Sequence, residues 1–138
     1  MGISTALVNI FGNQPSNYLI LDKLKFEILR DNEMTIEMGI LHIHTGNYEV
    51  IPVATSEIFY QFWLPACKSL GLQFISHFHD GSLNVVSAED VPKILEELIC
   101  LHSYTLAQEN LAFMSERIER IIQVFQTTDS TFYEYDFG

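Results

Sequence analysis

The fold of this chain is decided by 33-EMTIEMGILHIHTGNYEVIPVA-54, which has the pattern of two strands joined by a turn. Apolar and polar residues alternate along 33–44, as they do in a strand with one buried face. The segment 45-TGN-47 contains residues that favour tight turns, and it leads into a second apolar segment at 48–54. The stretch therefore predicts an antiparallel hairpin.

Two residues are expected to modify this hairpin. Before Gly39 the apolar side chains occupy even positions, whereas after it they occupy Leu41 and Ile43. A glycine within a strand often marks a bulge, so we expect a one-residue bulge at Gly39. Pro52 has no backbone N–H to donate, which predicts that 48–54 is an edge strand or ends there.

Regular patterns continue on both sides of the hairpin. Upstream, 24-LKFEILR-30 alternates apolar with charged residues and predicts a further strand, whereas residues 1–22 carry no pattern that assigns an element. Downstream, Thr55 or Ser56 can cap a helix over 57–70. That helix carries an aromatic-rich stripe at helical spacing, which is typical of a buried face.

A second hairpin is predicted directly after this helix. The segments 72-LQFISHF-78 and 82-SLNVV-86 flank Asp80-Gly81, a dipeptide that favours the type I′ turn between two strands. In such a hairpin His77 and His79 would share the polar face of the sheet.

The segment 88–127 has the pattern of a helix. Neither Gly nor Pro interrupts the chain from Lys93 to Phe137, so one long helix and a restart near Ser103 are both open. From Tyr104 onward the apolar residues recur in steps of three and four. This spacing fits a coiled-coil seam and fits packing against the protein's own sheet equally well.

The element order is strand, strand, strand, helix, strand, strand, helix. This order predicts an α+β fold, with an antiparallel sheet of about five strands, helices on one face and a long C-terminal helix. The chain has 138 residues, 48% of them apolar, so residues 1–128 are expected to form one domain. Residues 129–138 form an acidic, aromatic tail, which is expected to dock because exposed aromatic clusters are unfavourable in water.

The end of the chain also predicts a homodimer. A heptad-spaced helix and a tail that can add a strand to a sheet edge are both means of joining two copies. The residues expected at this interface, or at one with another protein, are Leu111, Met114, Ile118, Ile121, Phe125, Phe132, Tyr133, Tyr135 and Phe137.

The charge limits the partners of this protein. There are 18 acidic and 7 basic residues, for a net charge of −11. Binding to nucleic acids and to anionic membranes depends on Lys and Arg, so both are argued against, whereas a basic protein partner is permitted. No apolar run predicts a membrane span, and the start of the chain does not have the pattern of a secretory signal. We therefore expect a cytoplasmic protein with reduced cysteines.

Two His-x-His doublets, at 42–44 and 77–79, are the candidate metal ligands. Side chains two positions apart on a strand point to the same side, so both rings of a doublet can reach one ion. If the two hairpins are adjacent, four imidazoles could hold zinc or another divalent metal, with a carboxylate as a further ligand or base. The candidate site residues are His42, His44, His77, His79, Glu49 and Asp80.

Two resemblances extend this interpretation. The segment 42-HIHTGNYE-49 resembles the first metal-binding motif of cupins, in which two histidines one residue apart precede a glutamate. It lacks the glycine that cupins place beyond the glutamate, so the resemblance implies a ligand set and not the cupin fold. In element order and acidity the chain resembles small α+β chaperones of bacterial secretion and toxin-neutralising immunity proteins, which implies an interaction module.

The sequence contains no nucleophile elbow and no glycine-rich phosphate loop. We therefore expect a non-enzymatic binding or regulatory protein, chaperone-like or immunity-like, that acts as a dimer without a cofactor. The alternative is a metal-binding protein or metal-dependent enzyme that uses the two doublets.

Overall fold

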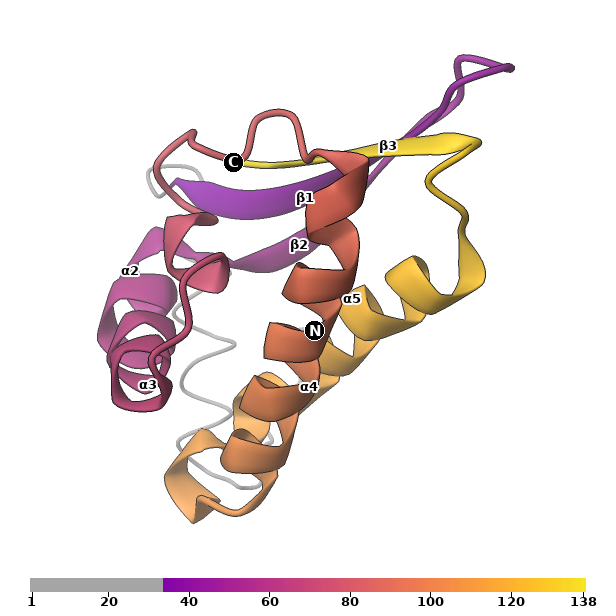
Figure 1. Cartoon of the computed structure of the whole chain (residues 1–138). Helices are drawn as coiled ribbons and strands as arrows, with labels where there is room; N and C mark the ends of the chain where they lie inside the picture. Colours follow the sequence, from indigo (N-terminus) through magenta and orange to yellow (C-terminus); the bar gives the residue numbers. More distant parts are fainter. Residues whose placement is uncertain (1–33) are drawn as a thin grey trace, which may run out of the picture. The chain divides into compact units, whose positions relative to one another are not determined.

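The computed structural model describes residues 34–138, and Figure 1 shows their arrangement. The strand predicted at 24–30 and the unassigned residues 1–22 lie outside the described residues. The fold is α+β, as predicted, but the described residues contain three strands rather than the greater part of a five-stranded sheet.

The sheet is antiparallel and has the order β2-β1-β3. β1 (Thr35–His42) and β2 (Tyr48–Thr55) form the predicted hairpin, and β3 (Tyr133–Phe137) pairs with the other side of β1. The helices lie on one side of this sheet (Figure 1). The last residues of the chain are therefore a strand of the sheet, joined to the centre of the fold by backbone hydrogen bonds.

The predicted bulge at Gly39 is wrong. Gly39 is in regular register opposite Val50, and the register shift lies between Ile36 and Glu37, where β2 carries the extra residue Val53. The buried phase of β1 runs unbroken from Ile36 to Ile40. Ile51 and Val53 share the buried face by ordinary alternation, and the extra residue brings Ala54 opposite the buried Ile36, so the helices still meet an apolar surface.

The helix predicted at 57–70 forms as a continuous helical segment. It consists of α2 (Ser56–Ile58), the π-helical turn η1 (Phe59–Trp63) and α3 (Leu64–Leu70). The Thr55 hydroxyl accepts the Ile58 N–H at 3.1 Å, which caps the first turn. The π turn directly precedes Pro65, which has no N–H to continue the helical bonding pattern, and such irregular turns occur where that pattern is interrupted.

The second predicted hairpin is wrong. Residues 72–86 form a compact loop with the single 3₁₀ turn η2 (Ile75–His77) in place of two strands. Two tertiary contacts override the Asp80-Gly81 signal. The Glu97 carboxylate accepts the N–H groups of residues 73–75, and Phe78 stacks on Phe137 with ring centroids 3.8 Å apart.

The prediction of a single long C-terminal helix is also wrong, and the chain forms two helices instead. After the 3₁₀ turn η3 (Ala88–Asp90), α4 (Val91–Leu106) runs away from the sheet; the 3₁₀ segment η4 (Glu109–Met114) reverses the chain, and α5 (Ser115–Thr127) returns. Figure 1 shows α4 and α5 side by side in opposite directions. Each has a buried apolar stripe, so packing the two stripes together requires the chain to reverse.

Candidate functional site

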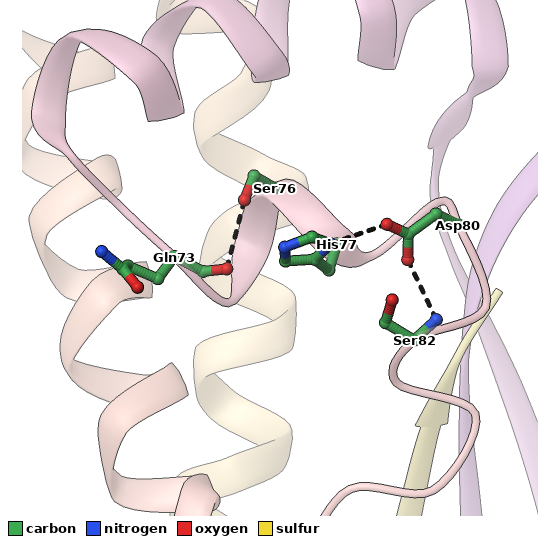
Figure 2. Close-up of polar contacts among 5 residues, drawn as sticks. All are labelled: Gln73, Ser76, His77, Asp80 and Ser82. Atoms are coloured by element: carbon green, nitrogen blue, oxygen red, sulfur yellow. Dashed lines mark hydrogen bonds and ion pairs between the residues drawn. The ribbon is translucent and has the colours of Figure 1, made fainter.

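The loop at 72–86 holds an Asp–His pair, which Figure 2 shows in close-up. The Nδ1 atom of His77 lies 2.6 Å from a carboxylate oxygen of Asp80, and the other oxygen accepts the Ser82 N–H at 2.9 Å. These bonds, the one from His77 foremost, hold the pKa of Asp80 well below its usual range. Because an ionised carboxylate only accepts, Nδ1 carries the proton and Nε2 of a neutral ring keeps a free lone pair.

His79 is held differently from His77, although it is only two residues away. Its ring packs between those of Phe59 and Tyr60, with centroid separations of 5.2 and 5.1 Å. Its Nδ1 atom is buried and has no hydrogen-bond partner among the described residues. The two rings of this doublet are therefore not presented together as ligands.

The other doublet lies where β1 runs into the hairpin turn. Nδ1 of His42 accepts the Thr45 N–H at 3.1 Å, and the ring packs edge-on against Tyr133 at 4.9 Å. The ring of His44 packs against Phe132 at 5.6 Å. Since Nδ1 of His42 accepts a bond, the proton of the neutral ring lies on Nε2, which leaves neither nitrogen free for a metal ion.

The structure does not join the predicted metal ligands into one site. The pair at 42–44 belongs to the hairpin and the pair at 77–79 to the loop before α4; the second hairpin on which convergence depended does not form. Within residues 34–138 no three His, Cys, Asp or Glu side chains gather closely enough to hold a metal ion. Glu49 is an exposed residue of β2, and Asp80 bonds to His77.

The predicted interface residues lie mainly in the protein's own core. Phe132 is 45% exposed and Tyr133 is half-buried. The other seven, Leu111, Met114, Ile118, Ile121, Phe125, Tyr135 and Phe137, are each at most 9% exposed. The heptad spacing is therefore explained by packing within the fold, which is the second of the two readings that the spacing left open.

The outer face of the sheet, turned away from the helices, has a different character. We define it by the outward residues Glu37, Gly39 and Leu41 of β1, Tyr48, Val50 and Pro52 of β2, and Glu134 and Asp136 of β3. Tyr48 is 55% exposed and Val50 44% exposed, whereas the apolar residues Met38, Ile40 and Ile51 on the inner face are buried. Two apolar side chains on one strand thus face solvent in the described structure.

A bond across the central strand orders this face. The Tyr48 hydroxyl of β2 donates to the Asp136 carboxylate of β3 at 3.1 Å, passing over Gly39 of β1. Any Cβ on Gly39 would collide with both partners. Desolvation and the bond to Asp136 raise the pKa of Tyr48, so the hydroxyl keeps its proton and remains a donor.

The charged side chains on the strands of the sheet are all acidic. The strands carry four carboxylates and no Lys or Arg: Glu37, Glu49, Glu134 and Asp136. The basic residues of the described part all lie on helices, at Lys68, Lys93, Arg117 and Arg120. The outer face is therefore apolar along β2 and acidic at Glu37, Glu134 and Asp136, whereas Glu49 lies on the other face, opposite Ile40. Carboxylates without a cation on the same strands favour a basic partner.

Sequence reasoning did not single out Tyr48 and Val50. The signal was present, because Tyr48, Val50 and Pro52 share one parity along 48–54 while Ile51 and Val53 supply the other. A strand with large apolar residues on both faces is either fully buried or has a partner on its second face.

Comparison with protein families, with curated proteins and with solved structures gave no match to this chain. No helix within residues 34–138 is long and apolar enough to cross a membrane.

Proposed function

We propose that this chain is a non-enzymatic binding protein that holds a basic protein partner on the outer face of its sheet. The observation that carries the proposal is the exposure of Tyr48 and Val50 on an edge strand of a sheet whose strands carry carboxylates and no Lys or Arg. Exposed apolar residues beside polar ones are typical of protein interfaces, and the negative charges steer a positive partner.

The charge of the outer face selects against a second copy as the occupant. Two copies meeting face to face would bring Glu37, Glu134 and Asp136 of each against the same carboxylates of the other. Such like-charge contacts favour a partner of opposite sign. The homodimer predicted from the sequence remains a separate proposal, and sedimentation of the full chain over a range of concentrations tests it.

The test uses a photo-crosslinking amino acid at Val50 in the full chain, with Val85 as the matched control. Val85 is also an exposed valine, 71% accessible, but lies in the loop at 72–86. We expect an adduct at Val50 only, to a protein of net positive charge. Adducts at both positions, an acidic partner, or no adduct at Val50 would each overturn the proposal.

The captured partner then permits a quantitative test. Val50→Lys puts a positive charge between Tyr48 and Pro52 on the outer face and is expected to weaken purified partner binding at least about tenfold, which is about 1.4 kcal/mol. Val85→Lys makes the same change of charge elsewhere and is expected to change binding less than about twofold. Equal losses in the two variants would show that net charge, and not this face, governs binding.

A metal-dependent function is the second candidate, and one observation favours it. Asp80 orients His77 and leaves its Nε2 lone pair free, which is the arrangement found behind metal-bound histidines. Zinc titration followed by mass spectrometry compares His77→Ala with His42→Ala. We expect any bound zinc to be lost only in His77→Ala; equal loss in both variants, or no zinc in the parent chain, contradicts this role.

A further inference from the structure

The sheet has two edges, and the structure closes one of them. On the β3 edge, the Val86 N–H donates to the Tyr135 carbonyl at 3.0 Å and the Phe137 N–H donates to the Leu83 carbonyl at 2.9 Å. Residues 83–86 therefore lie along β3 and bond to two of its outward backbone groups without forming a strand. Phe78 packs on Phe137 from the same loop, which holds this cover in place.

The β2 edge is different. The His42 N–H donates to the Asn47 carbonyl at 2.8 Å, and in an antiparallel pair the direction of the peptide groups alternates from there along the strand. The backbone groups of Glu49 and Ile51 then point to β1, whereas those of Tyr48 and Val50 point outward. None of the residues that the structure describes forms a backbone bond to these outward groups.

The far end of the β2 edge is blocked. Pro52 has no N–H, and its carbonyl accepts a bond from Nη1 of Arg117 at 3.2 Å. Burial lowers the pKa of Arg117, but an arginine still keeps its charge at neutral pH. The open part of the edge is thus the short segment at 48–50, next to the exposed side chains of the outer face.

We propose that a basic, extended segment of the partner adds to this edge as a further strand, with its backbone bonded to Tyr48 and Val50. This inference rests on the proposed function and specifies how the partner is held. Strand addition supplies affinity through main-chain bonds and selectivity through alternate side chains. Here the partner's apolar side chains would lie beside Tyr48 and Val50, and its alternate Lys or Arg side chains would lie on the other face, beside the exposed Glu49 of the same edge strand.

The probe for this inference is a short synthetic peptide of alternating lysine and valine, with an alternating glutamate and valine peptide as its control. We expect the full chain to bind the lysine peptide and not the glutamate peptide, with an affinity that falls as salt is raised. Equal binding of both peptides would remove the charge argument, and the proposed function would fall with it.

A comparison of Val50→Pro with Val50→Ala distinguishes backbone pairing at the β2 edge from side-chain contact with the outer face. Both replace the valine side chain, but only proline also removes the outward N–H, while the ladder to β1 is retained as it is at Pro52. We expect Val50→Pro to bind the lysine peptide about tenfold more weakly than Val50→Ala, since one lost hydrogen bond and a blocked strand account for about 1.4 kcal/mol. Equal affinities would overturn strand addition and leave binding to the outer face intact.

Amide exchange in the parent chain keeps the inference testable if Val50→Pro does not fold. We expect the Tyr48 and Val50 amides to exchange at least about tenfold more slowly when the lysine peptide is bound. Unchanged exchange in the bound state overturns the inference, and so does a lysine peptide that fails to bind at millimolar concentration. The proposed function would then depend on the crosslinking result alone.

Discussion

The two edge strands of the sheet have the same backbone arrangement, but the described residues cover only one of them. β2 and β3 are both short outer strands that flank β1, and each turns alternate peptide groups outward. On β3 the Tyr135 carbonyl and the Phe137 N–H bond to residues 83–86, whereas the outward groups of Tyr48 and Val50 form no backbone bond to a described residue. An uncovered edge invites pairing with another chain, so the covering of one edge makes the other a candidate for function.

The largest predicted effect concerns Phe78, which holds the loop at 72–86 against the β3 edge. Phe78→Ala removes a fully buried ring from its stack on Phe137 and is expected to lower the free energy of unfolding by about 3–5 kcal/mol. Val85→Ala, at an exposed position in the same loop, is expected to cost less than about 0.5 kcal/mol. Urea denaturation measures both, and a loss below about 1 kcal/mol for Phe78→Ala would show that the loop is not held by this ring.

The next effect concerns the hydrogen bond between Tyr48 and Asp136, which crosses the outer face of the sheet. Gly39→Ala places a methyl group where the Tyr48 hydroxyl and the Asp136 carboxylate meet, and we expect a loss of about 1–3 kcal/mol from overpacking. Tyr48→Ala removes the far end of the clash, so the double variant should regain part of that loss. Strictly additive losses in a thermal denaturation cycle would mean that Gly39 serves another purpose.

A smaller effect concerns the Glu97 carboxylate, which holds the loop at 72–86 in its conformation. Glu97→Gln halves the acceptor capacity offered to the N–H groups of residues 73–75 and is expected to cost about 1–2 kcal/mol. Glu96→Gln, on the exposed side of α4, is the matched control and should be close to neutral.

The reactivity of Cys67 provides an independent test of the Glu97→Gln change. Burial, together with the charge of Glu97, raises the pKa of Cys67 to about 12, so its thiol is unreactive in the folded state, whereas Cys100 is exposed. We expect iodoacetamide to label Cys100 alone in the parent chain and in Glu96→Gln, with faster labelling of Cys67 in Glu97→Gln. Mass spectrometry of the labelled chain measures both sites, and identical Cys67 rates in the two variants would contradict the role of Glu97.

The smallest effect is a dependence of stability on pH. The pKa of Asp80 is lower in the folded protein than its ordinary value of 3.8, so its contribution is full above that value and is lost as the pH falls through the folded pKa. Since the pair is exposed, the contribution is about 1 kcal/mol or less. His77→Ala should therefore flatten the acid limb of the stability curve, and an unchanged limb would show that the pair is energetically silent.

The hairpin at 33–54 could be predicted because its pattern is local. Alternation, turn residues and Pro52 are all read within one short stretch, and β1 and β2 follow them closely. The role of Gly39 could not be read there, because the two side chains that require a glycine come from different strands. One of them, Asp136, is almost a hundred positions away in the chain.

The loop at 72–86 shows the opposite case. Asp80-Gly81 is a strong local signal for a hairpin, yet Glu97 and Phe137, both remote in sequence, determine the conformation. The same error displaced the candidate metal site, since His77 and His79 were placed on a strand that does not form. Local chemistry predicted which residues could act, and tertiary contacts decided where they lie.

Hydrogen–deuterium exchange of the free, full-length chain tests the central claim most directly. The amides of Val50 and Phe137 occupy equivalent outward positions on the two edge strands, and Phe137 is bonded to the Leu83 carbonyl at 2.9 Å. We predict that the Val50 amide exchanges at least about a hundredfold faster than that of Phe137, as expected for an exposed group beside one that opens only with the fold. Equal protection at the two positions would show that the β2 edge is already occupied, and would contradict its assignment as the surface that receives a partner.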